Sequence, residues 1–204
     1  MIGIIGKKIG MSQLFLQNGE LTAVSVIQAG PCPILQVKDD KNDGYKAIQL
    51  GFGIKKRINK PMTGHLKKSK TKSVARIFEI RVNDTGKYKV GDNIDVAAFA
   101  NGDKVAVIGW TKGRGFSGGM KRWGWTGGPA THGSMSHRRI GSSGAGSSPG
   151  RVWKGKTMPG RYGNERVTVK NLRVIKVEKE KNTIYLKGAV PGARNSYLMI
   201  TKDE

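Results

Sequence analysis

The sequence predicts a mainly β protein, a barrel or a sandwich, with a long basic segment between two of its strands. Two observations support this fold class. Short apolar runs are separated by Asn-Gly, Asp-Gly and other polar turns every 8–15 residues, which favours antiparallel sheets over a parallel α/β sheet. Residues 112–162, by contrast, contain 14 glycines and no leucine, too little apolar area to offset the entropy of ordering them.

The expected strands follow one another in hairpins. The first turn, residues 17–20, contains an Asn-Gly pair that tolerates positive φ and separates strands at Leu14–Leu16 and Leu21–Ile27. Further turns are expected at Asp43-Gly44, at Asn101-Gly102 and over residues 178–182, and a short basic helix near Met62–Leu66. The strands beside these turns are Ile34–Lys38, Tyr45–Leu50, Ile94–Phe99, Val105–Trp110, Val167–Val177, Thr183–Leu186 and Tyr197–Ile200.

Composition narrows the class of protein. The 204 residues include 37 Lys or Arg and 14 Asp or Glu, a formal net charge of +23, which points to a polyanionic partner. No apolar run approaches the ~20 residues of a membrane span, and the apolar start is too short for a secretory signal. A single cysteine, Cys32, excludes an internal disulfide, so we expect an intracellular protein.

The positive charge is concentrated in two segments. Residues 44–78 hold ten Lys or Arg and no acid, and residues 112–162 hold ten more, again with no acid. The other 118 residues carry 17 bases and 14 acids, a net of only +3. This segregation is typical of an electrostatic footprint for nucleic acid. For residues 44–78, a solvated lysine-rich loop stays open as the alternative.

Three of the four tryptophans lie in the second basic segment: Trp123, Trp125 and Trp153. Indole and guanidinium planes stack on unpaired bases, and glycine lets a backbone approach phosphates. We expect residues 112–162 to form an extended arm, held at both ends by strands and ordered against RNA. Irregular RNA suits such an arm better than duplex DNA, whose major groove receives a helix or a ribbon. Packing back on the β body is the alternative for Trp110 and Trp153.

The motifs that would indicate other chemistry are incomplete. Gly113–Gly118 matches a dinucleotide fingerprint, but no acid follows ~20 residues later and no βαβ unit surrounds it. His132 and His137 lack the further ligands that zinc needs. The serines of the arm have no nearby carboxylate to orient a histidine. We therefore expect no cofactor, no metal, no small-molecule substrate and no enzymatic activity.

Ordered blocks along nearly the whole chain resemble the bacterial form of large-subunit ribosomal protein three (the ribosomal protein L three family). The blocks are Met1-Ile2-Gly3, Gly6-Lys7-Lys8-Ile9-Gly10-Met11, Asp43-Gly44-Tyr45, Ala47-Ile48-Gln49, Lys60-Pro61 with Gly64-His65, Phe99 through Gly113-Arg114-Gly115 to Arg122-Trp123, Thr131-His132-Gly133, Ser136-His137-Arg138, Pro149-Gly150-Arg151-Val152, Lys154-Gly155-Lys156, Gly163-Asn164-Glu165-Arg166-Val167-Thr168 and Lys187–Gly192.

This resemblance implies a closed six-stranded barrel of the translation-protein type, a small α+β insertion and a long extended basic arm. With the charge distribution, it divides the chain into a barrel body (1–44, 79–111 and 163–204), a basic insertion (45–78) and the arm (112–162). It also implies a structural protein of the large (50S) subunit that is cytoplasmic, in the ribosome. Such a protein binds 23S rRNA near its 3′ domain, acts early in assembly and extends its arm toward the peptidyl transferase centre.

The resemblance further implies neighbouring ribosomal proteins as partners, with proteins fourteen and nineteen expected, and no membrane. Two positions depart from the family pattern. Ser147 stands where many members have a glutamine that becomes methylated, so that modification is not expected. Ala106 stands where Asp or Asn is usual, so we expect no polar role there.

The candidate RNA-binding residues are cations, aromatic side chains and the serine near the tip of the arm. They are Lys7, Lys8, Lys55, Lys56, Arg57, His65, Lys112, Arg114, Lys121, Arg122, Trp123, Trp125, His132, His137, Arg138, Arg139, Ser147, Arg151, Trp153, Lys154, Lys156, Arg161 and Arg166. The alternative function is that of a nucleoid-type, non-specific nucleic-acid-binding protein. That protein would bind duplex DNA as well as it binds folded rRNA.

Overall fold

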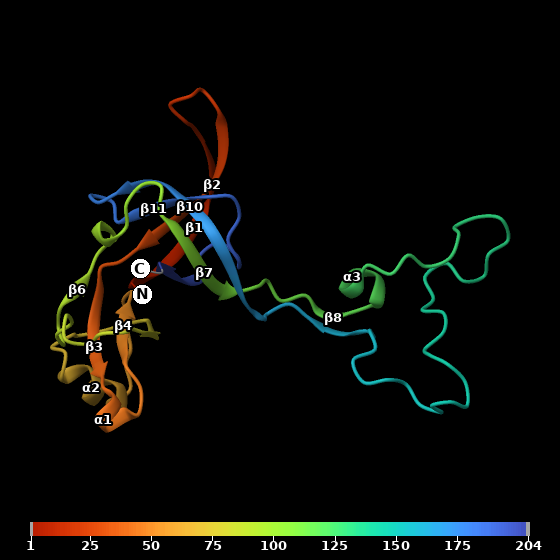
Figure 1. Cartoon of the computed structure of the whole chain (residues 1–204), viewed down its shortest axis with the longest axis horizontal. Helices are drawn as coiled ribbons and strands as arrows, with labels where there is room; N and C mark the ends of the chain where they lie inside the picture. The colour runs from red at the N-terminus through yellow and green to blue at the C-terminus, as the bar shows by residue number, and fades with distance from the viewer. Residues whose placement is uncertain (1, 203–204) are drawn as a thin grey trace. The chain divides into compact units, whose positions relative to one another are not determined.

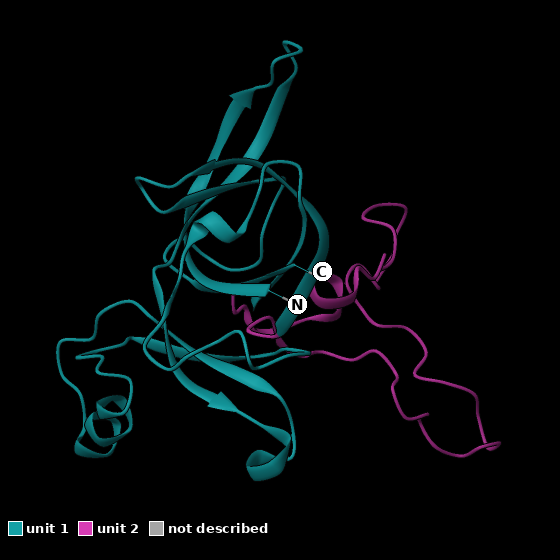
Figure 2. Ribbon diagram, turned by 60° about the vertical axis from the view of Figure 1, so that its left-hand side comes forward, with its two compact units in different colours: residues 1–111, 166–204 teal, residues 112–165 magenta. Residues whose placement is uncertain are grey.

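A computed structural model describes residues 2–202 and divides the chain into two compact units (Figures 1 and 2). Unit 1 comprises residues 1–111 and 166–204, and unit 2 comprises residues 112–165. The structure is mainly β, as the sequence predicts.

Six strands of unit 1 form a closed ring in which each strand pairs antiparallel with two neighbours. In ring order they are β1 (Ile2–Phe15), β12 (Tyr197–Lys202), β7 (Lys104–Trp110), β10 (Arg166–Glu178), β11 (Thr183–Lys187) and β2 (Leu21–Ala29). A Cβ on Gly6 of β1 would lie 2.6 Å from Ile27 Cγ2 of β2, so this close strand contact requires glycine.

The core lies inside unit 1 and follows the two-residue period of its strands. Val105 and Val107 of β7 are buried, whereas Lys104 at the start of the strand is exposed. Ile4, Ile184 and Ile200 contribute fully buried side chains from three other ring strands. Burial of such a side chain contributes about 1.5–3 kcal/mol to folding, so the ring has a substantial core of its own.

A second, four-stranded sheet of unit 1 runs in the order β5-β4-β3-β6. Its strands are β3 (Cys32–Lys38), β4 (Ala47–Phe52), β5 (Arg76–Arg81) and β6 (Asn93–Ile94), accompanied by the helices α1 (Asp40–Asp43) and α2 (Lys60–Lys67) and the 3-10 turn η1 (Val96–Ala98). Leu66 of α2 packs in a small cluster with Leu35 and Val74, which ties the helix to the sheet. This packing explains why a short lysine-rich helix is stable here.

Unit 2 has little regular structure and no apolar core. Its elements are β8 (Gly115–Ser117), α3 (Gly119–Trp123) and β9 (Gly160–Tyr162). Strands β8 and β9 pair antiparallel at the two ends of the unit. Within residues 112–165, all of which the structure describes, only Ser117, Gly119 and Gly163 are buried.

Most expected elements of unit 1 are confirmed, including the first hairpin, the β7 strand, the C-terminal strands and the helix around Met62. The strand expected at Ile94–Phe99 is wrong beyond Ile94. Val96 and Phe99 are both buried, and a three-residue spacing puts two side chains on one face of a 3-10 turn rather than of a strand. The sequence pattern did not predict β5, β8, β9, α1 and α3.

Candidate nucleic-acid interface

Unit 2 presents its cations to solvent. Nine of its ten Lys and Arg side chains are exposed: Lys112, Arg114, Lys121, Arg138, Arg139, Arg151, Lys154, Lys156 and Arg161. The tenth, Arg122, is half-buried. None of the ten takes part in an ion pair with a carboxylate among residues 2–202. Unit 2 therefore carries a high density of positive charge that is not neutralised within the described chain.

Such a charge distribution suits a phosphate backbone. Exposed like charges repel one another within a Debye length of about 8 Å at physiological salt, so the unit gains when a polyanion neutralises them. Each phosphate that a Lys or Arg neutralises also releases counterions, which favours binding.

Helix α3 anchors the aromatic side chains of unit 2. Gly124 ends the helix in the left-handed conformation at φ 72°, and its N–H donates to Met120 O. The Met158 carbonyl then accepts two hydrogen bonds, from Arg122 Nη1 at 2.8 Å and from Trp123 Nε1 at 2.9 Å. These bonds hold the helix against the returning chain of the same unit.

Two guanidinium–indole pairs lie on the surface of unit 2. The Arg122 guanidinium lies 4.9 Å from the Trp123 ring, and that of Arg151 lies 5.3 Å from the Trp153 ring. The two tryptophans keep 48% and 59% of their surface exposed. Exposed indole and guanidinium planes are the groups on which unpaired bases stack.

Trp125 differs from the other two tryptophans of unit 2. Its ring packs directly on Gly119, where any Cβ would overlap it, and its Nε1 donates to Thr157 Oγ1 at 3.3 Å. The ring also lines an open hollow of about 720 Å³ together with Arg139 and Ile140. One face of the indole is therefore used inside the unit, and the hollow is large enough for a nucleobase beside it.

The remaining predicted residues of unit 2 are exposed. His132 adopts φ 59°, His137 Nδ1 lies 3.0 Å from Pro129 O, and Ser147 lies in an exposed turn closed by a bond from Gly150 N to Gly146 O. Beyond these bonds within the chain, all three side chains are open to solvent.

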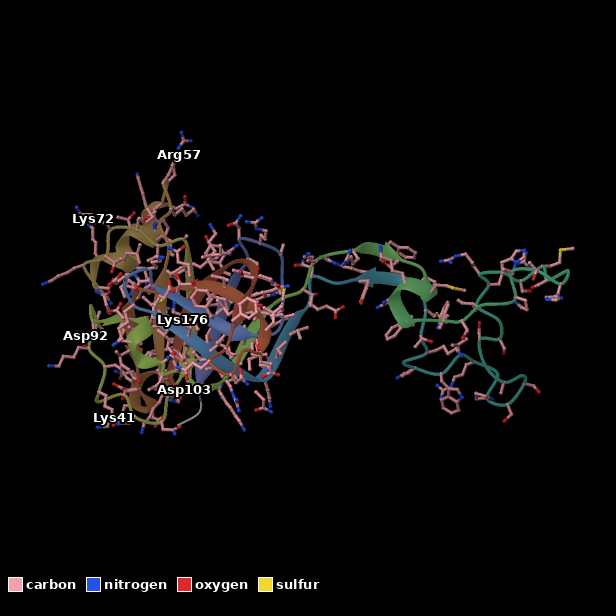
Figure 3. The ribbon with its side chains drawn as sticks, turned by 90° about the horizontal axis from the view of Figure 1, so that it is seen from above. Lys41, Arg57, Lys72, Asp92, Asp103 and Lys176 are labelled. Atoms are coloured by element: carbon pink, nitrogen blue, oxygen red, sulfur yellow. The ribbon has the colours of Figure 1, made fainter. Side chains whose placement is uncertain are left out.

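In unit 1, Lys55, Lys56 and Arg57 are exposed, and Arg57 projects from the chain as Lys72 does (Figure 3). His65 of α2 is half-buried, and its Nε2 lies 2.6 Å from Gln49 Oε1. His65 thus links the helix to β4.

Lys8 differs from the other predicted cations in being buried. Its side chain is only 8% exposed, and its Nζ donates to Val190 O at 2.9 Å and to Gly192 O at 3.4 Å. The ammonium therefore satisfies backbone carbonyls inside unit 1, and its contact with RNA stays a prediction. Lys7, its neighbour, is half-buried and closer to solvent.

Unit 1 contains a basic hollow of its own, which the sequence pattern did not predict. A cavity of about 710 Å³ is lined by side chains of β5, β7, β10 and β12. Its cations are Arg81, Lys104, Arg166 and Lys170, of which only Arg166 was predicted. Arg166, Thr168 and Lys170 alternate along β10, and this two-residue spacing is the signal that could have found the hollow.

The one acid at this hollow, Glu79, is already paired. Lys38 Nζ lies 2.7 Å from Glu79 Oε1, and Tyr45 Oη donates to Oε2 at 2.9 Å. The hydrogen bond from Lys38 holds the pKa of the Glu79 carboxyl below its usual value, so the carboxylate stays charged and bound to its partner. The cations around the hollow therefore keep a net positive potential.

Other kinds of site are not found in the described part of the chain. In residues 2–202, no three His, Cys, Asp or Glu side chains lie together as metal ligands would. No helix described here is long and apolar enough to span a bilayer.

The fold and the distribution of charge together define a class of protein. It is mainly β, and its candidate nucleic-acid interface includes exposed tryptophans. Residues 37–183 match the family model described as Ribosomal protein L3. The chain is 52% identical over 200 residues to the large ribosomal subunit protein uL3 of Pseudothermotoga lettingae, covering 97% of this chain and 95% of the relative. It is 50% identical to the uL3 proteins of Thermotoga maritima and Herpetosiphon aurantiacus, covering 97% and 98% of this chain and 95% of each relative. The chain belongs to the ribosomal protein L3 family, whose members are proteins of the large ribosomal subunit.

Proposed function

We propose that this protein binds 23S rRNA directly, near its 3′ domain, as a structural component of the large subunit in the cytoplasmic ribosome. Unit 2 is the main contact: its exposed Lys and Arg neutralise phosphates, and Trp123 and Trp153 stack on bases. The observation that carries the proposal is the absence of any ion pair at the ten cations of unit 2 within residues 2–202.

The finer features of the proposed function are those that the family resemblance implies. The six-stranded ring acts as the translation-protein-type barrel, residues 45–78 as its basic insertion and residues 112–162 as an arm that runs toward the peptidyl transferase centre. The protein binds early during assembly and lies beside other large-subunit proteins, of which fourteen and nineteen are the expected neighbours. It positions RNA and performs no chemistry.

Two regions give this proposal its support. Unit 2 has no buried apolar side chain, so binding to a partner has to offset the entropy that the unit loses when it becomes ordered. The hollow lined by Arg81, Lys104 and Lys170 adds a second cationic surface on unit 1.

The test compares binding of the full chain to a 3′-domain fragment of 23S rRNA and to duplex DNA of equal charge, over a salt series. We expect rRNA binding to persist at salt concentrations that abolish DNA binding, with fluorescence of the exposed tryptophans quenched on complex formation. Equal affinities with one common salt slope would contradict specific rRNA recognition. That result would favour the nucleoid-type function.

A further inference from the structure

The outer parts of β1 and β2 form a hairpin with one apolar face that the rest of unit 1 leaves uncovered. The strand register pairs Met11 with Ser25, Gln13 with Ala23 and Phe15 with Leu21. Side chains of directly opposed residues share a face of an antiparallel pair. Ser25, opposite Met11, is buried and bonds to Gly188 O. The exposed residues of this face are Met11, Gln13, Phe15, Leu21 and Ala23, which we call the hairpin face.

All five residues of the hairpin face are exposed, and three of them are large apolar side chains. Phe15 has 77% of its surface exposed, Met11 53% and Leu21 51%. On the opposite face of the same hairpin, Thr22 and Val24 are buried. The hairpin, which projects from the rest of unit 1 in Figures 1 and 2, therefore has an apolar face that is exposed to solvent.

The charge of the hairpin sets it apart from the rest of this chain. Residues 9–37 contain a single charged side chain, Glu20, in a protein of net charge +23. Glu20 lies at the turn, where Asn18 Nδ2 donates to Glu20 Oε2 at 3.2 Å. RNA affinity depends on Lys and Arg at phosphates, and the hairpin offers none while its one carboxylate repels phosphate.

We propose that the hairpin face docks on another protein of the large ribosomal subunit, through an apolar patch with a Lys or Arg beside it for Glu20. The proposal rests on the proposed function, because it requires the chain to assemble with rRNA and other proteins. Phe15 is the anchor, since exposed aromatic side chains that become buried dominate protein interfaces. Cationic segments of the chain then bind RNA, and the hairpin, whose one charged residue is Glu20, binds protein.

The direct test places a photoreactive benzoylphenylalanine at position 15 of the full chain, assembled into large subunits. We expect an adduct that survives ribonuclease, disappears with protease and maps to one peptide of another subunit protein with apolar residues and a Lys or Arg. An adduct to rRNA, an adduct to a second copy of this chain, or no adduct would each overturn the proposal.

The same photoreactive residue at position 139 of unit 2 separates this proposal from the proposed function. Position 139 should give an adduct to rRNA. If it does and position 15 gives no protein adduct, docking fails and rRNA binding stands. If position 15 gives the protein adduct and position 139 gives none to rRNA, docking stands and the RNA contact of unit 2 fails.

A pair of substitutions measures the strength of the docking. The double variant Met11→Ser with Phe15→Ser should weaken the affinity of the full chain for the cross-linked protein by about tenfold or more. Ser12→Ala, at an exposed position of β1 outside the hairpin face, is the matched control and should change that affinity less than about twofold. Both replaced apolar side chains are more than half exposed, so the thermal melting of the variant should match the wild type. Unchanged affinity in the double variant would overturn the proposal.

Discussion

Unit 1 and unit 2 are held together by different kinds of interaction. The ring of unit 1 encloses fully buried residues such as Ile4, Ile184 and Ile200. Unit 2 buries only Ser117, Gly119 and Gly163 and holds its chain with hydrogen bonds and stacked rings. The difference shows that a segment without a core can still carry a specific arrangement of side chains, provided that both ends are fixed and a partner supplies the rest.

The largest expected effect comes from removing charge in unit 2. The triple variant Arg138→Ala, Arg139→Ala and Arg151→Ala should weaken rRNA binding by about tenfold or more. It should also flatten the slope of log affinity against log salt by about 2, because roughly 0.7 counterions are released per phosphate of a single strand. Filter binding over a salt series measures both quantities.

The matched control removes three exposed lysines of unit 1: Lys41, Lys87 and Lys89. This variant has the same net charge as the triple variant of unit 2. An equal loss of affinity in the two variants would show that total charge, rather than its place in unit 2, governs binding.

The next effect concerns the core that only unit 1 has. Ile184→Ala should lower the free energy of unfolding by about 2–5 kcal/mol, because the side chain is fully buried and a cavity remains. Val152→Ala in unit 2 should change it by less than about 0.5 kcal/mol, since Val152 is 45% exposed. Urea unfolding followed by far-UV circular dichroism measures both, and equal destabilisation would contradict the contrast between the units.

A glycine substitution tests the local order of unit 2. Gly163 adopts φ 74°, and a Cβ there would overlap the Lys112 carbonyl oxygen beside the β8–β9 pair. Gly163→Ala should therefore loosen unit 2 and speed its proteolysis several-fold while the ring melts as before. Gly155→Ala is the matched control, because Gly155 has φ 81° but no atom within 4 Å of its Cβ position. Its cost is limited to backbone strain of about 1 kcal/mol.

A smaller effect concerns pH and lies entirely in unit 1. Lys38 lowers the pKa of Glu79 in the folded protein below its ordinary value of 4.5. The contribution of the Lys38–Glu79 pair to the free energy of unfolding is therefore complete above pH 4.5. It is lost as the pH falls through the lower pKa of Glu79 in the folded protein. Glu79→Gln should reduce the loss of unfolding free energy at acidic pH by less than about 1 kcal/mol, because the pair is partly exposed. Urea unfolding at several pH values tests the sign, and a steeper decline in the variant would contradict it.

A separate prediction concerns the buried thiol of unit 1. Burial raises the pKa of Cys32 to about 12, so almost no thiolate exists at neutral pH. A thiol reagent should label the folded protein far more slowly than the urea-unfolded protein. Fast labelling of the native chain would show that β3 opens readily.

The sequence predicts the fold class and most strands of unit 1 because alternation and turn residues are local signals. It cannot predict which carbonyls the ring leaves unpaired, so the burial of Lys8 against Val190 O was not foreseen. The basic hollow was missed for a related reason. Lys104 and Arg81 lie on strands of two different sheets of unit 1, and only the packing of these sheets brings the two residues to one hollow.

In unit 2, composition indicates the charge and the glycines but not the internal contacts. The packing of Trp125 on Gly119 depends on the left-handed turn at Gly124 that ends α3, and no periodicity encodes that turn. The exposure of Trp123 and Trp153 agrees with the stacking role that the sequence suggests, and the RNA contacts themselves stay a prediction.

Hydrogen exchange of the full chain, alone and bound to the 3′-domain fragment of 23S rRNA, tests the division between the two units most directly. The amides of residues 112–165 should exchange quickly in the free protein and slow by about tenfold or more in the complex. The amides of β7 and β12, in the ring, should be slow in both states. Unit 2 amides that exchange equally fast with and without rRNA would contradict the proposal that RNA orders this unit.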